Sequence, residues 1–271
     1  SIGIPIFHRV VPPIEEHGPA ILKLALSKVE KPNLFILDDQ SPISQELLER
    51  LKKYLTKDYV TNFDSFPDST TDFSAPIAKL KAAGANSVIF LGWEFQAANL
   101  IKQLRMAGYS GILTISESSR DVISKLVTPK FLEGLRMTTS SVPIANFNMI
   151  IESDFRLEMK VPSGQYAAEA IDATNVVLYC ISVNSINRES MLKCIDNYKG
   201  RSVYGNTFGF APSGDPADQP VRSLEFRDGQ FLLFDSLEPN NKFTLNSFPW
   251  ISSVSNGVAP IPKPAQTFSV N

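Results

Sequence analysis

Cysteine and histidine are both scarce in this chain of 271 residues. The two cysteines, Cys180 and Cys194, are too few for a disulfide scaffold. The two histidines, His8 and His17, are nine positions apart, which is not the spacing of a zinc motif, and we expect surface or loop positions for both. No metal site is therefore predicted.

An excess of one charge and a long apolar run are also missing. The 26 basic residues are balanced by 28 acidic ones, so nucleic acid and anionic membranes are not the expected partners. The most apolar helical stretch, residues 166–186, carries Glu169 and Asp172, so it is not predicted to cross a membrane. No secretion signal opens the chain, and we expect a soluble protein. The 43% of apolar residues are ample for a packed core.

The glycine-rich and nucleophile motifs of common enzymes are absent as well. The chain has no G-x-S-x-G, no G-x-x-x-x-G-K-S/T and no G-x-G-x-x-G. An α/β enzyme that uses a nicotinamide or ATP normally shows one of these glycine loops. We therefore expect no cofactor and no catalytic activity.

Residues 33–137 alternate regularly between short apolar runs and amphipathic segments. Short apolar runs predict strands, and amphipathic segments between them predict helices, with a further helix ahead of the first strand. This order is typical of a parallel sheet covered on both faces, and it predicts one α/β lobe over residues 10–143. The expected strands are 33–37, 59–66, 87–91 and 111–115, and the expected helices are 19–29, 44–55, 72–83 and 95–106.

The chain after residue 143 has a different pattern of expected elements. Two helices are expected at 163–185 and 188–198, the latter capped by Asn187. Hairpin strands are expected at 207–210, 221–226 and 230–234, with Asp228-Gly229 as a turn. These elements have no parallel sheet of their own to lie on. Residues 241–271 are rich in Ser, Asn and Pro and predict an extended tail.

Ligands of open α/β sheets bind at the carboxyl ends of the strands. Four places meet this rule: 38–41, 67–71, 92–94 and 116–119. Trp93 offers a flat apolar surface there, and Glu117 could pair with an ammonium group. The alternative is that Trp93 packs between helices and that Glu117 only favours a helix start.

Five segments, in order, are similar to one known family. They are PIFHRVVPP; the stretch from TDFSAPIAKLKAAGANSVIFLGW to AANLIKQLRMAGYSG; FLEGLRMTTSSVP; YAAEAIDATNVVL; and GNTFGFAPSGDPADQPVRSLEFRDGQF. Together they resemble the type I periplasmic binding proteins of branched-chain amino acid ABC transporters.

The resemblance implies a fold of two doubly wound α/β lobes joined by three crossing segments. Residues 10–143 match one complete lobe, and residues 1–9 and 144–240 match crossing segments and late elements of the other. The early part of that other lobe, on the order of 120 residues, has no counterpart here. We expect the apolar face of the helix at 166–186 to be covered by that part or by a partner chain.

The resemblance also implies a site and a role. Glu117 matches the acidic residue that meets an α-ammonium group, and Trp93 and Tyr166 match aromatic residues beside the ligand. Ile43, near Ser41, replaces a common tyrosine and suggests a more apolar cleft, and Ser116 precedes the glutamate. The implied function is the capture of a small amino acid for the membrane permease of an ABC importer, in the periplasm or elsewhere outside the cytoplasm. The alternative on the same fold is the ligand-sensing domain of a signalling protein.

Cys180 and Cys194 fall on adjacent predicted helices. A location outside the cytoplasm favours a disulfide between them, and reduced, buried cysteines are the alternative. A separation of more than about 7 Å between their α-carbons would exclude the bridge.

Overall fold

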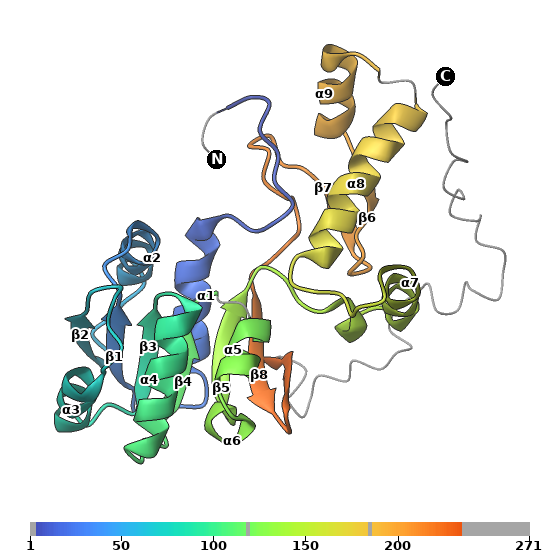
Figure 1. Cartoon of the computed structure of the whole chain (residues 1–271). Helices are drawn as coiled ribbons and strands as arrows, with labels where there is room; N and C mark the ends of the chain where they lie inside the picture. The colour runs from blue at the N-terminus through green and yellow to red at the C-terminus, as the bar shows by residue number, and fades with distance from the viewer. Residues whose placement is uncertain (1–3, 118–119, 184–185, 235–271) are drawn as a thin grey trace. The chain divides into compact units, whose positions relative to one another are not determined.

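A computed structural model describes residues 4–117, 120–183 and 186–234 of the chain. Its main feature is a seven-stranded sheet with the strand order β2-β1-β3-β4-β5-β8-β9 (Figure 1). The tail expected at 241–271 lies outside the described residues.

The first five strands of the sheet run parallel; four of them are the predicted strands, and β5 is an additional one. Each pairs with its neighbours in a parallel register, such as Leu34 opposite Ser87 and Ser87 opposite Ile112. Their bounds are β1 Asn33–Asp38, β2 Val60–Ser65, β3 Ser87–Leu91, β4 Ile112–Ile115 and β5 Leu135–Thr139. The predicted α/β fold is confirmed.

The apolar strands bury both of their faces, and this explains why they do not alternate with polar residues. In β1, Leu34 and Ile36 pack in one core with helices α1 (His17–Leu26) and α2 (Pro42–Lys52). Phe35 and Leu37 point the other way, into a second core with α3 (Ser74–Ala82) and α4 (Glu94–Met106). Successive side chains of a strand point to opposite faces, so a helix layer on each face demands a continuous apolar run.

Local signals set the helix ends close to the predicted ones. Ser41 precedes Pro42 and accepts a hydrogen bond from the Ser44 amide at 3.3 Å, which caps α2. Gly108, two residues after α4 ends, has a φ of +80°, where a side chain would be strained. The short helices η1 (Ile14–Glu16) and α6 (Pro129–Leu132) were not predicted, whereas a helix after Glu117, here α5 (Arg120–Leu126), was expected without bounds.

An antiparallel hairpin completes the sheet beside β5. It consists of β8 (Arg222–Arg227) and β9 (Gln230–Leu233), joined by Asp228-Gly229, the turn that the sequence predicted. We expected residues 144–240, which include this hairpin, to belong to the second lobe. The hairpin instead pairs with β5 and extends the sheet formed by residues 10–143. A buried ion pair joins it to β5: Arg136 Nε lies 3.1 Å from Glu225 Oε2.

The rest of the described chain after residue 143 consists of three longer helices and a small separate sheet. Helix α8 spans Ala167–Ser182, and α9 spans Arg188–Asp196 with Asn187 and Ser190 in a capping box. Strands β6 (Lys199–Arg201) and β7 (Thr207–Gly209) pair antiparallel. The turn η2 (Ile144–Asn146) and helix α7 (Met149–Met159) were not predicted.

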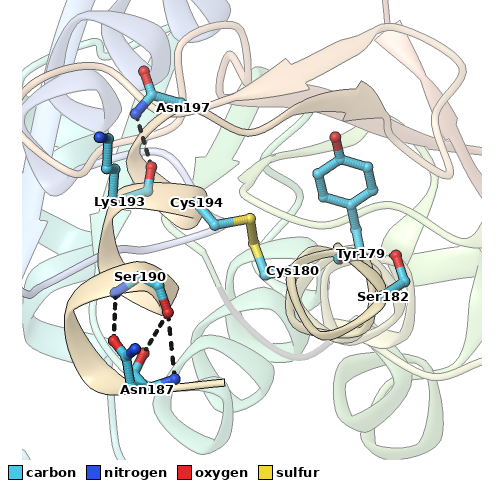
Figure 2. The surroundings of a disulfide bond; sticks show 8 residues. All are labelled: Tyr179, Cys180, Ser182, Asn187, Ser190, Lys193, Cys194 and Asn197. Atoms are coloured by element: carbon cyan, nitrogen blue, oxygen red, sulfur yellow. Dashed lines mark hydrogen bonds between the residues drawn. A yellow bond between two sulfur atoms is a disulfide. The ribbon is translucent and has the colours of Figure 1, made fainter. Parts of the chain in front are cut away.

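A disulfide ties α8 to α9. Cys180 and Cys194 are bonded, with their α-carbons 5.8 Å apart, which confirms the bridge (Figure 2). It joins the buried side of α8 to a helix that has no fully buried residue of its own.

The opposite side of α8 is apolar and exposed. Val177, Leu178 and Ile181 are each between 44% and 57% exposed, whereas Val176 and Cys180 are buried. Spacings of three and four residues put the exposed side chains on one stripe. Within the described part of the chain nothing covers this stripe; that a further segment or a partner chain covers it stays a prediction. No helix in that part is long and apolar enough to cross a membrane.

Candidate functional site

Glu117 stands at the carboxyl end of β4, where the strand-end rule places ligands. Ser116, just before it, is buried, and its amide donates to the Phe90 carbonyl at 3.0 Å, which continues the parallel ladder with β3. The backbone is thereby fixed up to the glutamate. The side chain of Glu117 is 22% exposed, so its carboxylate can be reached from solvent.

Three donors hold the Glu117 carboxylate. The Ser140 amide donates to Oε1 at 3.0 Å, and the Ser140 hydroxyl donates to Oε2 at 2.7 Å. The Tyr166 hydroxyl donates to Oε1 at 2.6 Å. Ser140 directly follows β5, so the ends of two neighbouring strands and the start of α8 meet at this carboxylate.

Tyr166 reaches Glu117 from an unusual backbone conformation. Its φ of 64° places it in the left-handed region, which costs free energy for a residue with a side chain. Its amide donates to Ser141 Oγ at 2.9 Å. Burial, and then the Glu117 carboxylate, raise the pKa of the Tyr166 hydroxyl, which therefore stays protonated and acts as a donor.

His17 belongs to the same cluster, and the expected surface or loop position was wrong for it. It is the first residue of α1 and is 6% exposed. Its Nε2 lies 3.1 Å from Ser140 Oγ and 3.7 Å from Glu117 Oε2. Burial lowers the pKa of His17, and the nearby Glu117 opposes that shift only in part.

Two buried carboxylates on α8 anchor the helix, and one of them, Glu169, shares the Ser141 hydroxyl with the Tyr166 amide. Glu169 accepts from Ser141 Oγ at 2.8 Å and from the Tyr204 hydroxyl, and Asp172 accepts from Ser202 Oγ at 2.5 Å. Burial raises the pKa of both carboxyls. Because Ser141 follows Ser140, the first of these bonds ties the start of α8 to the end of β5.

The other predicted residues follow the neighbouring strands β1 and β3, and within the described residues none of them has a hydrogen bond or ion pair with Glu117. Trp93 is the residue before α4 and is 49% exposed. Ile43, in the first turn of α2, is 54% exposed, and Ser41 caps that helix. The packing alternative for Trp93 is not supported by so open a position. Ser41 has a local structural role.

The cluster has the chemistry to hold a cation. Its single accessible charged group is a carboxylate held by neutral donors, which suits an ammonium group. In the described ranges, no group of three or more His, Cys, Asp or Glu side chains is placed to hold a metal ion. Sequence reasoning missed Ser140, although the Ser140-Ser141 pair lies in FLEGLRMTTSSVP, one of the segments that carry the family resemblance. It had no signal for His17.

With this geometry in place, comparison with known proteins defines the class. The model of the family "Periplasmic binding protein" matches residues 9–230, and the chain belongs to that family. A curated relative, Leu/Ile/Val-binding protein homolog 3 of Brucella melitensis, is 22% identical over 170 residues. That match covers 62% of this chain and 42% of the relative, so the chain spans less than half of that relative's length.

Two solved structures share the fold. The leucine binding protein LivK of Thermotoga maritima gives a TM-score of 0.71 at 16% identity, covering 86% of this chain and 68% of the other. The branched-chain amino acid transporter substrate binding protein LivJ of Streptococcus pneumoniae, in complex with isoleucine, gives 0.67 at 13% identity. That match covers 80% of this chain and 63% of LivJ.

Proposed function

We propose that this chain is part of the solute-binding component of an ABC importer and takes up a small amino acid or a related amine. The observation that carries the proposal is the Glu117 carboxylate. It stands at a strand end, partly open to solvent, and three hydrogen bonds from neutral groups orient it. A ligand ammonium that leaves water needs such an anionic partner, because an unpaired buried charge is costly.

In this proposal, Trp93 and Ile43 supply the apolar side of the cleft, and Tyr166 closes it beside Glu117. Ser41 and Ser116 shape the strand ends on which these residues stand. The exposed tryptophan, at 49%, has free surface for a ligand's apolar stem. A membrane permease is the partner that the importer role requires. The Cys180–Cys194 disulfide supports a location outside the cytoplasm, where such bonds persist.

The exposed stripe of α8 fits the same proposal. Residues 10–143 would be one lobe, and residues 1–9 and 144–240, apart from the hairpin on the first lobe's sheet, would contribute to a second. We propose that further elements of the second lobe, or a partner chain, cover Val177, Leu178 and Ile181. The 44–57% exposure of these side chains supports this, since large apolar surface is rarely left open to water.

Titration calorimetry with matched ligands tests the proposal. Suitable probes are L-leucine and 4-methylpentanoate, which share the branched stem and the carboxylate but differ in the amine. The protein should include the complete second lobe. Glu117→Gln should weaken leucine binding by about 1.5–3 kcal/mol, the range for hydrogen bonds to charged groups. It should leave 4-methylpentanoate binding almost unchanged.

Trp93→Ala is the companion variant. It should weaken both probes, because it removes contact with the stem that they share. Equal leucine affinity in Glu117→Gln and wild type would show that the glutamate serves only local structure, and amine recognition at this residue would then be rejected.

A further inference from the structure

His17 is a buried ionisable side chain beside Glu117 to which the proposed function gives no role. It comes from α1, whereas Ser140 follows β5 and Glu117 follows β4. Nε2 of the ring lies 3.1 Å from Ser140 Oγ and 3.7 Å from Glu117 Oε2, so the imidazole is next to the carboxylate and to one of its donors.

The hydrogen bonds of Ser140 define how His17 takes part. A serine hydroxyl has one proton, and here that proton is donated to Glu117 Oε2 at 2.7 Å. The Ser140 oxygen can therefore only accept from His17, so Nε2 must carry a hydrogen. A chain of hydrogen bonds then runs from the imidazole through the hydroxyl to the carboxylate, and each donor fixes the direction of the next.

The other charged side chains near α1 form their ion pairs and hydrogen bonds with groups other than His17. Arg50 on α2 pairs with Glu15 and Glu46, both in exposed positions. Arg136 on β5 lies at the far end of α1, where it donates to the Leu24 and Ser27 carbonyls and pairs with Glu225 of β8.

Nearer His17, Arg120 of α5 donates to the Ser141 carbonyl, and Glu16 precedes the histidine on its own chain segment. Strands β3 and β4, which also pack on α1, have no ionisable residue. Glu117 is thus the charged group that the ring meets directly.

We propose that His17 is a positioning residue of the amine site and makes ligand binding depend on pH, an inference that rests on the proposed function. The neutral ring orients Ser140, and Ser140 in turn orients Glu117 toward a ligand. A protonated ring places a positive charge 3.7 Å from the carboxylate, where it competes with the ligand's ammonium for the same anion. Acidification therefore releases the ligand.

Burial favours the neutral ring and thus supports this switch, because it lowers the pKa of His17 below its usual 6.5. The site is then in its binding form at neutral pH and changes as the pH falls through the lowered pKa of His17. The nearby carboxylate of Glu169 accepts from the hydroxyl groups of Ser141 and Tyr204.

The test is leucine titration of the protein with both lobes complete, at about pH 7.5, 6.5, 5.5 and 4.5, a range that extends well below the usual pKa of an imidazole. In the wild type we expect the affinity to fall with acidification, by at most about tenfold per pH unit, the limit for uptake of one proton. His17→Gln keeps a side-chain donor but cannot be protonated, so its affinity should change far less over this range. His17→Leu should bind more weakly than His17→Gln at every pH, because Ser140 loses its donor.

His8→Gln is the matched control, since His8 and His17 are the only histidines of the chain. His8 contacts Asp196 at 2.8 Å, and no contact joins it to Glu117, so this variant should keep the wild-type pH profile. A wild-type pH profile in His17→Gln would overturn the proposal, and so would a flat profile in the wild type.

A second measurement separates this inference from the proposed function. The imidazole titrations of the ligand-free protein can be followed by NMR, with His8→Gln to assign the signals. Glu117→Gln should lower the pKa of His17, because the carboxylate stabilises the imidazolium. If leucine fails to bind while this coupling is seen, the proposed ligand class is wrong but the His17–Glu117 switch stands. If the pKa of His17 does not respond to Glu117→Gln, the switch is wrong whatever the ligand.

Discussion

Tyr166 donates a hydrogen bond to Glu117 across 49 residues of chain, with 2.6 Å between Oη and Oε1. The bond joins the residue before α8 to the end of β4. It is the clearest geometric support for a site that two separate parts of the chain build together.

Tyr166→Phe removes this bond and keeps the ring. The carboxylate retains both donors of Ser140, and Tyr166 is 42% exposed, so water can replace the lost hydroxyl. We expect the free energy of unfolding to fall by less than about 1 kcal/mol. Leucine affinity should fall less than in Glu117→Gln. Urea unfolding and calorimetry give the two values, and a larger affinity loss than in Glu117→Gln would contradict this ranking.

The buried ion pair between β5 and β8 should matter far more than its exposed neighbour. Arg136 and Glu225 have side chains only 4% and 7% exposed, and Arg136 also donates to carbonyls of α1. Arg136→Met would leave Glu225 with only the half-exposed Arg227 as a partner and would leave the Leu24 carbonyl without its donor, so it should cost about 3–5 kcal/mol of unfolding free energy.

Arg227→Met is the matched control on the same carboxylate. Arg227 is 42% exposed and lies 2.6 Å from the other oxygen of Glu225, so its loss should cost less than about 1 kcal/mol. Urea titration of both variants gives the comparison. Similar losses in the two would show that burial does not decide the strength of these contacts.

The disulfide should stabilise helix α9 against local unfolding more than it stabilises the sheet. The bridge closes a sequence separation of 14 residues, for which chain entropy predicts about 3 kcal/mol. In the double variant Cys180→Ala, Cys194→Ala we expect faster amide exchange in α9, because that helix has no fully buried residue to hold it. Exchange in α4, which lies in the core, serves as the internal reference. Unchanged exchange in α9 would show that packing alone holds it.

His17 should make folding less favourable in mild acid. Its pKa in the folded protein is lowered from 6.5, mainly by burial, so the unfolded chain binds the proton more strongly. Its contribution to stability is therefore complete above about pH 6.5 and is lost as the pH falls through the lower, folded value. The raised pKa values of Glu169 and Asp172 act in the opposite sense: the folded state gains as these carboxyls take up protons.

Urea unfolding between about pH 5 and 7.5 separates these contributions. The difference between wild type and His17→Gln should shrink or reverse with acidification, because only the wild type has to protonate a buried ring. His8→Gln should run parallel to the wild type, since His8 lies outside this cluster. A constant difference between wild type and His17→Gln would contradict the assignment.

The sequence predicted most of the sheet and its covering helices for one physical reason. Strands such as Ser87–Leu91 are buried on both faces, so their apolar pattern does not depend on which neighbour they meet. Helix α7 escaped prediction because Glu152 is its only fully buried residue and its apolar side chains Met149, Ile150 and Leu157 are exposed. A helix without a buried apolar stripe leaves no clear periodic signal.

The site could be predicted only in part. Glu117 follows a predicted strand, and this alone places it at the ligand-binding edge, whereas Tyr166 entered through family resemblance. His17 could not be found, because its role depends on a contact with Ser140 over 123 positions of sequence. Periodicity and capping describe neighbours along the chain and carry no information about such a contact.

The chain of contacts from His17 through Ser140 and Glu117 to Tyr166 also offers a way to identify the ligand. These four residues come from separate elements spread over 150 positions, so no short peptide can reproduce the site. A molecule that binds there binds only the folded protein and raises its unfolding free energy by mass action, by about 2.7 kcal/mol at a hundredfold excess over Kd. Melting-temperature screens of amines and amino acids can therefore reveal the natural solute before any transport assay exists.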